Sequence, residues 1–314
     1  MAKVIQHALV TGGAGFIGSH LVDALMRKGT RVSVIDNLST GKRENLPEAA
    51  MNFVFHEGDI RDWVLLRKVM EGVDVVFHQA AVVSVPLSVA EPLESAAVNE
   101  MGTLSVLEAA RQAGCRRVVL ASSSAVYGDD PELPKHEAMA LWPLSPYAVQ
   151  KMVGERYAGL YSTLYGLETT CLRYFNVFGP RQDPASPYSG VISIFMDRAV
   201  ADQAPAIYGD GEQTRDFVYV QDVIAANLLA AAEKGAAGKI FNIGTGITIT
   251  INRLWQLVAE MAGITLTPEY KTAREGDILH SVAAIDASRR DLGFVPRVGF
   301  EEGLAHTYAW YRNG

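Results

Sequence analysis

Short apolar runs alternate along the first half of the chain with longer segments in which apolar residues recur at helical spacing. The apolar runs lie at residues 8–10, 31–35, 53–55, 73–77, 117–120 and 169–172. Apolar strands separated by helices are typical of a parallel sheet with helices on both faces. The pattern therefore predicts an α/β fold built on a Rossmann-type, doubly wound parallel sheet.

The alternation loosens after Arg173. Residues 179–189 are rich in Pro, Gly and Ser, and short strands expected at 216–220 and 239–243 are interleaved with helices that begin near Asp222 and Ile251. We expect residues 1–173, with a return near 222–245, to form the sheet domain. Residues 174–314 would mainly form a smaller, irregular C-terminal part that packs against the sheet.

Composition narrows the class of protein. The chain has 314 residues, 49% of them hydrophobic, and a formal net charge of −7 without any basic run. Nucleic acids and anionic membranes require clustered Lys and Arg, so neither is an expected partner. No apolar stretch reaches the roughly 18–20 residues of a membrane span, and no signal-peptide pattern precedes the first strand. The two cysteines, Cys115 and Cys171, exclude a disulfide framework. We expect a cytoplasmic globular enzyme without a metal site.

A glycine-rich loop, Gly12-Gly13-Ala14-Gly15-Phe16-Ile17-Gly18, follows the first predicted strand and opens the first predicted helix. Gly12 and Gly15 would let the backbone approach a pyrophosphate, and Gly18 would let helix and sheet touch. The same loop in isolation would also suit a plain strand-to-helix turn. The second strand ends at Asp36, where a carboxylate can bond the adenosine ribose hydroxyls and repel a 2′-phosphate. The predicted cofactor is therefore NAD rather than NADP.

Two further segments lie at the same predicted edge of the sheet. Asp59 and Ile60 follow the third strand, where the adenine would rest, although this segment would also suit a helix cap. Gln79 and Ala80 follow the fourth strand, where small side chains leave room for a dinucleotide. Asn99 lies in an amphipathic helix, and taken alone it is more typical of a surface or capping position than of a ligand.

Tyr147 and Lys151 are four residues apart in a predicted helix with proline in its first turn, so they share one face. An adjacent ammonium and a cationic nicotinamide both favour the phenolate, which would make Tyr147 a base and Lys151 its tuning group. Such a pair also occurs by chance in many helices. The run Ser122-Ser123-Ser124 ends the fifth strand and could relay a proton to Tyr147, or could simply form a turn that bonds its own backbone.

These motifs occur together with residues 36–41, 173–184, 209–220 and 274–281. In this combination, which covers nearly the whole length, the chain resembles the extended short-chain dehydrogenases/reductases. It is most similar to their nucleotide-sugar 4-epimerases, the UDP-galactose and UDP-N-acetylglucosamine 4-epimerase group. The resemblance implies that Tyr147 is the base, that Ser123 bridges it to the substrate with Ser124 beside it, and that Lys151 assists.

The resemblance also implies which residues hold NAD and the UDP-sugar. Arg215 and Arg274 would face the diphosphate, since guanidinium groups suit phosphate oxygens; without the resemblance they would be ordinary surface charges. The implied NAD contacts are Gly12, Gly15, Phe16, Ile17, Gly18, Asp36, Asn37, Ser39, Gly41, Asp59, Ile60, Gln79, Ala80, Asn99, Ser122, Tyr147, Lys151 and, beside the nicotinamide, Tyr174. The implied UDP-sugar contacts are Ser84, Ser123, Tyr147, Asn176, Val191, Tyr208, Arg215, Arg274, Asp277 and Ser281.

The implied reaction has two hydride steps. Tyr147 removes the proton from the sugar O4 as the C4 hydride passes to NAD, and the 4-keto sugar turns and takes the hydride back on its opposite face. Related dehydratases typically carry Asp-Glu, and decarboxylases a Glu, where this chain has Ser124-Ala125. A UDP-glucuronate 4-epimerase or another nucleotide-sugar-modifying enzyme remains an alternative. A non-catalytic NAD-binding regulator is a remote one, since both Tyr147 and Lys151 are present.

Two finer expectations concern the sugar and the assembly. In the family, a residue at the position of Ser281 limits the space near the sugar C2, so a small serine predicts that N-acetylated sugars are accepted beside UDP-Glc and UDP-Gal. The resemblance also implies a homodimer packed through two helices, here about 92–113 and 146–165. Both segments carry more apolar positions than one buried stripe requires, as two buried faces would, although a fully buried monomer helix would show the same pattern.

Overall fold

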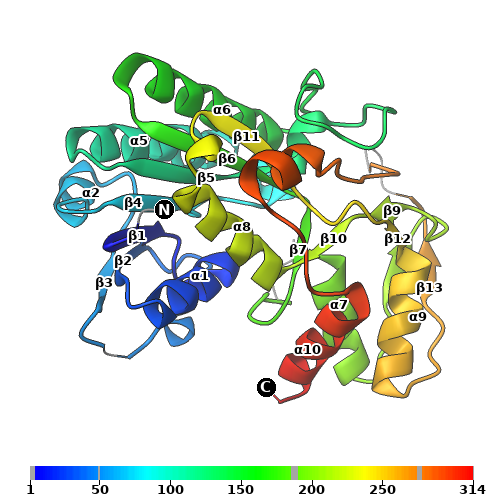
Figure 1. Cartoon of the computed structure of the whole chain (residues 1–314). Helices are drawn as coiled ribbons and strands as arrows, with labels where there is room; N and C mark the ends of the chain where they lie inside the picture. The colour runs from blue at the N-terminus through cyan, green and yellow to red at the C-terminus, as the bar shows by residue number, and fades with distance from the viewer. Residues whose placement is uncertain (1–3, 49, 185–189, 274–277, 314) are drawn as a thin grey trace.

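The computed structural model describes residues 4–48, 50–184, 190–273 and 278–313 (Figure 1). A sheet of seven strands, all paired in parallel, confirms the predicted α/β class. Its order is β11-β6-β5-β4-β1-β2-β3. The bounds are β1 His7–Thr11, β2 Arg31–Asp36, β3 Phe53–Glu57, β4 Val75–His78, β5 Arg117–Ser123, β6 Glu168–Tyr174 and β11 Lys239–Ile243.

Helices cover both faces of this sheet, as Figure 1 shows. Helices α1 (Phe16–Arg27) and α8 (Val220–Ala232) pack on one face, and α2 (Trp63–Val69), α5 (Thr103–Gln112) and α6 (Pro146–Tyr165) pack on the other. Successive residues of a strand pack alternately against the helices of one face and the helices of the other, because side chains along a strand point to opposite faces. In β1, for example, Val10 joins the apolar cluster with α1 and α8, whereas Leu9 joins the cluster with α2 and α5.

The strand order reverses beside β1. The chain passes from β1 to β2 and β3 on one side and then crosses to β4 on the other. The loops after β1 and β4 meet at the carboxyl edge beside this reversal, which is where open α/β sheets bind their ligands. The residues predicted to hold the cofactor lie in and around these two loops.

The segment 92–113, expected as one helix, is interrupted. It consists of α4 (Pro92–Ala96), a π-helical turn η2 (Ala97–Gly102) and α5, and it is preceded by the short helix α3 (Val85–Ala90). At the turn, Asn99 bonds a loop instead of facing solvent, and Gly102 lies against Ile60. A π-helical turn inside an α-helix often marks a functional position.

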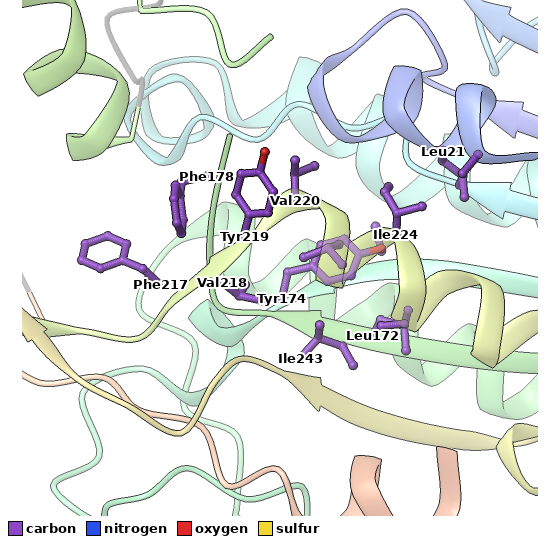
Figure 2. Packing of buried hydrophobic residues seen from close by; sticks show 14 of the residues in the cluster. Leu21, Leu172, Tyr174, Phe178, Phe217, Val218, Tyr219, Val220, Ile224 and Ile243 are labelled. Carbon is purple, nitrogen blue, oxygen red and sulfur yellow. The ribbon is translucent and has the colours of Figure 1, made fainter. Parts of the chain in front are cut away.

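The described C-terminal residues add three helices, namely α7 (Val191–Val200), α9 (Ile251–Ala262) and α10 (Phe300–Asn313). They also add three two-stranded sheets. In these, β7 (Asn176–Phe178) pairs with β10 (Phe217–Tyr219), β9 (Thr214–Arg215) with β12 (Ile249–Thr250), and β8 (Ala206–Tyr208) with β13 (Glu269–Lys271). The short turns are η1 (Arg43–Asn45), η3 (Ser124–Tyr127), η4 (Lys234–Ala236) and η5 (Ser288–Leu292). One apolar cluster runs from the sheet into this part without a break. Figure 2 shows Phe178 beside Tyr219, and the same cluster continues to Leu172 and Tyr174 of β6. Within the described residues, no helix combines the length and apolar character needed to cross a membrane.

Candidate active site

The glycine loop lies between β1 and α1. Gly12 has φ +68°, and a Cβ at this position would lie 2.7 Å from the Ala80 nitrogen, so the loops after β1 and β4 touch here. A Cβ at Gly18 would lie 2.1 Å from the Gly12 carbonyl oxygen. The first turn of α1, which includes Phe16 and Ile17, has neither a side-chain cap nor an acidic residue. Its unpaired N–H groups and the positive end of its dipole therefore fit a pyrophosphate.

Gly18→Ala is expected to destabilise the protein by about 1–3 kcal/mol and to weaken NAD binding, because the added methyl group would push α1 away from the loop. Thermal unfolding with and without NAD measures both effects. Gly299→Ala is the matched control, since Gly299 is exposed and an added Cβ there meets no atom within 4 Å. Equal unfolding temperatures of the two variants would contradict the close-contact argument.

Asp36 ends β2 and lies against the glycine loop. Its carboxylate oxygens accept hydrogen bonds from the N–H of Ala14 at 2.9 Å and of Leu38 at 2.8 Å. Burial raises the pKa of Asp36, and these two hydrogen bonds oppose that shift. A carboxylate has further lone pairs beyond two bonds, so Asp36 can still accept from ribose hydroxyls. Ser39 and Gly41 lie in the loop that follows.

The segment after β3 is held by ion pairs. Asp59 accepts hydrogen bonds from the Arg61 guanidinium at 2.9 Å and from Asn37 Nδ2 at 3.0 Å, and the Arg61 contact lowers the pKa of Asp59. The helix cap belongs to Asp62, whose side chain accepts from two N–H groups of α2. Ile60 is buried. Asn37 and Asp59, which the resemblance implies as NAD contacts, are thus in direct contact.

Asn99 is buried, unlike the surface or capping position that is typical of such a residue taken alone. Its Oδ1 accepts from the Val82 N–H at 2.8 Å, and its Nδ2 donates to the Val82 carbonyl oxygen at 2.9 Å and to Gln150 Oε1 at 2.7 Å. Since Gln150 lies on α6, the Asn99 side chain holds the loop after β4 against that helix. Period and amphipathicity gave no sign of this contact.

Gln79 and Tyr174 are brought together at the carboxyl ends of β4 and β6. The Tyr174 hydroxyl accepts from Gln79 Nε2 at 3.1 Å and from Asn227 Nδ2 at 2.8 Å. Asn227 lies on α8, so this polar group joins two strand ends to the returning helix. Burial raises the pKa of Tyr174 to about 12, which keeps the phenol neutral.

The predicted catalytic residues meet where β5 ends against α6. The Tyr147 hydroxyl lies close to the Ser123 side chain, which acts to lower the pKa of the phenol. Lys151 Nζ donates to the Ala121 carbonyl oxygen at 2.9 Å and lies 5.9 Å from the centre of the Tyr147 ring. Ser124 begins η3, directly after Ser123. The Ser122 hydroxyl points elsewhere, because it donates to Glu155 Oε1 at 2.6 Å.

Burial dominates the proton affinities of this pair. It raises the pKa of Tyr147, and the contact with Ser123 opposes the rise. It lowers the pKa of Lys151 to about 8, which the Glu155 carboxylate opposes. The phenolate expected beside Lys151 is therefore not favoured in the protein alone, because desolvation outweighs the ammonium. The positive charge of an oxidised nicotinamide would add the missing stabilisation.

The predicted substrate residues come from the C-terminal part and from α3. Arg215 Nη1 donates to the carbonyl oxygens of Thr214 at 2.9 Å and Leu279 at 3.2 Å, and the Ser281 N–H donates to Thr214 at 3.2 Å. Arg215 thus ends the short strand β9, and Ser281 lies in the segment that is bonded to Thr214 of this strand. The other described members are placed by β7, α7, β8 and the start of α3: Asn176, Val191, Tyr208 and Ser84. Arg274 and Asp277 lie outside the described residues.

Sequence reasoning missed Asp216, which organises this side. Its fully buried carboxylate accepts from the N–H groups of Thr245, Gly246 and Ala283 and from the Thr245 hydroxyl. The only signal was its place beside Arg215, at the start of an apolar run. Among the described residues, no group of three or more His, Cys, Asp or Glu is placed to hold a metal ion.

Comparisons with known proteins agree with this geometry. A family model described as the NAD dependent epimerase/dehydratase family matches residues 8–244. UDP-glucose 4-epimerase of Mycolicibacterium smegmatis is 42% identical over 98% of this chain and 99% of its own length.

Two solved structures are similar over the whole fold. UDP-glucose 4-epimerase of Thermotoga maritima with UDP-glucose is 41% identical with a TM-score of 0.94, covering 98% of this chain and 99% of its own. UDP-N-acetylglucosamine 4-epimerase of Methanobrevibacter ruminantium in complex with UDP-N-acetylmuramic acid is 42% identical, with the same TM-score and coverage. The family model spans well over half of the chain, and the chain therefore belongs to the NAD-dependent epimerase/dehydratase family.

Proposed function

We infer that this protein is an NAD-dependent 4-epimerase of UDP-hexoses, acting on the UDP-Glc/UDP-Gal pair and also on UDP-GlcNAc/UDP-GalNAc. The observation that carries the inference is the meeting of Ser123, Tyr147 and Lys151 at the carboxyl end of β5. Similarity to UDP-glucose and UDP-N-acetylglucosamine 4-epimerases over nearly the full length supports both sugar pairs.

We propose that residues 1–173, with the return at 222–245, bind the cofactor. The phosphates would lie at the start of α1, the adenosine ribose at Asp36, the adenine near Asp59 and Ile60, and the nicotinamide between Lys151 and Tyr174. Gln79 and Ala80 would line the passage between these ends. Asn99 would act through the loop it holds, and Ser122 through its backbone, since the side-chain groups of both are already hydrogen-bonded.

We propose that the UDP-sugar lies between this domain and residues 174–314. Arg215 would bind the diphosphate together with Arg274. Asn176, Val191, Tyr208 and Asp277 would hold the nucleotide end. Ser84 and Ser281 would line the sugar. The net negative charge of the chain favours a few placed guanidinium groups over a basic surface for binding this anionic substrate.

In the proposed mechanism, Tyr147 takes the proton from the sugar O4 and later returns it, with Ser123 as the bridging hydroxyl. NAD, when bound, would supply the hydride acceptor and donor for the sugar C4. Lys151 would stabilise the Tyr147 phenolate and hold the nicotinamide ribose. Arg215 and its neighbours would keep the diphosphate in place while the 4-keto sugar turns to present its opposite face to the nicotinamide. Ser124-Ala125 offers no carboxyl group for elimination, which favours epimerisation over dehydration.

The test of this function is incubation of the NAD-loaded protein with UDP-Glc, UDP-GlcNAc and UDP-GlcA in separate reactions. Chromatography resolves the epimers, and absorbance follows NADH. We expect the first two sugars to reach an equilibrium of C4 epimers without accumulated NADH. Conversion of UDP-GlcA alone would instead support a UDP-glucuronate 4-epimerase. Conversion of none of the three sugars would contradict the proposal that this protein is an epimerase.

NAD binding is expected to shift the ionisation of Tyr147 to lower pH. Burial raises the pKa of this phenol in the protein alone, and the positive nicotinamide favours the phenolate. Tyrosinate absorbance should therefore appear at lower pH in the NAD-loaded protein than in the NAD-free protein. The difference should vanish in Tyr147→Phe. A shift of the same size in that variant would assign it to another tyrosine.

We further propose a homodimer formed through α6 and the helices around η2. Leu93, Met101, Leu160 and Leu164 on these elements are exposed apolar side chains, which a second copy would cover. Leu164→Glu should yield a monomer in sedimentation analysis where the unaltered protein is a dimer; a monomeric unaltered protein would contradict the proposal.

We also propose a cytoplasmic location, which the buried, unpaired thiols of Cys115 and Cys171 support.

A further inference from the structure

A buried ion pair lies directly behind the catalytic residues and has no role in the mechanism described above. Glu155 on α6 accepts from Arg173 Nε at 2.8 Å and Nη2 at 2.7 Å, and both side chains are only 2% exposed. Burying two charges is costly, and apolar residues of similar volume often serve stability equally well. The pair therefore calls for an explanation other than stability.

The carboxylate is the third of three contacts that join one helix face to one strand end. Tyr147, Lys151 and Glu155 follow one another at intervals of four residues along α6. They contact three consecutive residues of β5: the Ser123 side chain, the Ala121 carbonyl oxygen at 2.9 Å and the Ser122 hydroxyl at 2.6 Å, respectively. Along β5, the contact of Ser122 with Glu155 thus lies between the Ala121 contact of Lys151 and the Ser123 contact of Tyr147.

The ion pair is oriented. At its far end, Arg173 Nη1 donates to the Tyr127 hydroxyl at 2.9 Å, and the guanidinium lies 4.8 Å from the centre of the Tyr127 ring. The Tyr127 hydroxyl in turn donates to Asn242 of β11 at 2.7 Å. The Arg173 guanidinium is therefore held beside Tyr127, and the Glu155 carboxylate is the member of the pair that acts on Lys151.

The surroundings of Lys151 are otherwise poor in negative charge. Its titratable neighbours are Tyr147 and Glu155 on its own helix, Cys171 on β6 and His78 on β4, while β5 contributes the Ala121 carbonyl oxygen. Burial raises the pKa of the Cys171 thiol and lowers that of His78 to about 3, so both are neutral near pH 7. Of these groups, Glu155 is the carboxylate, and it is paired with Arg173.

We propose that Glu155, oriented by Arg173, is a positioning residue that sets the register of Ser122 and Ser123 against α6 and keeps Lys151 in its ammonium form. This rests on the proposed function for the roles of Tyr147 and Lys151. Without the carboxylate, the buried ammonium loses a proton more readily and no longer supports the phenolate or the nicotinamide ribose near neutral pH.

The test compares Glu155→Gln with the double variant Glu155→Gln/Arg173→Met. The single variant leaves a buried guanidinium unpaired and can fail to fold, whereas the double variant removes both charges together. In the unaltered protein, NAD affinity should fall above a certain pH, at which Lys151 loses its proton. In the folded variants, we expect this pH to be lower by about one unit or more, because an opposite charge at close range shifts a pKa by that amount. Calorimetric titration of NAD at several pH values measures this shift without any turnover of a sugar.

A second ion pair, which joins β5 to β6, serves as the control. Arg117 at the start of β5 binds Glu168 at the start of β6, with contacts of 2.7 and 2.9 Å, at the opposite end from the site. Glu168→Gln should lower the unfolding temperature but leave the pH dependence of NAD affinity unchanged. A purely structural role of Glu155 predicts the same behaviour for the double variant, and that result would overturn the proposal.

Ser122→Ala tests the register separately and leaves the ion pair intact. We expect it to lower kcat several-fold with little change in NAD affinity, because only the placement of Ser123 and Tyr147 is affected. If neither charge variant folds, an unaltered kcat in Ser122→Ala overturns the proposal. Failure of the proposed function would appear differently, as a protein that binds NAD with the predicted pH shifts but converts no UDP-hexose.

Discussion

Tyr147→Phe is expected to lower kcat for UDP-hexose epimerisation by about 10²–10⁴-fold, because the variant has no group that can take or return the O4 proton. The buried ring still packs in the same place, so NAD affinity and the unfolding temperature should change little. Epimer formation under saturating UDP-Glc measures kcat, and calorimetry measures NAD binding.

Tyr161→Phe is the control for this substitution. Tyr161 is also a buried tyrosine of α6, but its hydroxyl donates to Glu108 at 3.0 Å, away from Ser123 and Lys151. The control should keep near-normal activity. A Tyr147→Phe enzyme within threefold of the unaltered rate would show that another group moves the proton.

Ser281→Tyr is expected to reduce turnover of UDP-GlcNAc and UDP-GalNAc by about 100-fold while UDP-Glc and UDP-Gal are still converted. Ser281 is partly buried beside Thr214, next to Arg215, where a large ring would fill space that an N-acetyl group needs. The kcat/KM values for the two sugar pairs give the change in specificity directly.

Ser281→Ala separates size from polarity. It removes the hydroxyl without filling space, so both sugar pairs should be converted as before. Loss of both pairs in Ser281→Tyr would indicate general damage to the site. Retention of both would mean that another residue sets the space at the sugar C2.

Much of the fold could be predicted because it depends on local pattern. The apolar runs identified six of the seven sheet strands, and the seventh, Lys239–Ile243, was expected with the same bounds. The interruption of the segment 92–113 was not predictable in this way. A π-helical turn keeps helical composition, and here it accompanies a contact of Asn99 with Val82 that lies outside the helix.

The candidate site could be predicted where a motif carries the chemistry within a few residues. Tyr147 and Lys151 share a helix face, and the serine run at the end of the fifth strand indicated a hydroxyl group near them. The choice of Ser123 within that run came from the family resemblance. The roles of Asp216 and Arg173 could not be predicted from a local motif, because their partners are distant in sequence. Ser122 shows a further limit: its place in the serine run suggested the cofactor, but its hydroxyl binds Glu155.

In the proposed reaction, the C4 hydride leaves the sugar and returns to the same carbon inside one active site. Epimerisation of UDP-Glc in D2O, followed by mass spectrometry of the recovered UDP-Gal, tests this most directly. Because the transferred hydride never meets solvent, we expect a product without carbon-bound deuterium. Deuterium at C4, or at a neighbouring carbon, would rule out this hydride transfer, since it would place a solvent proton on the carbon skeleton.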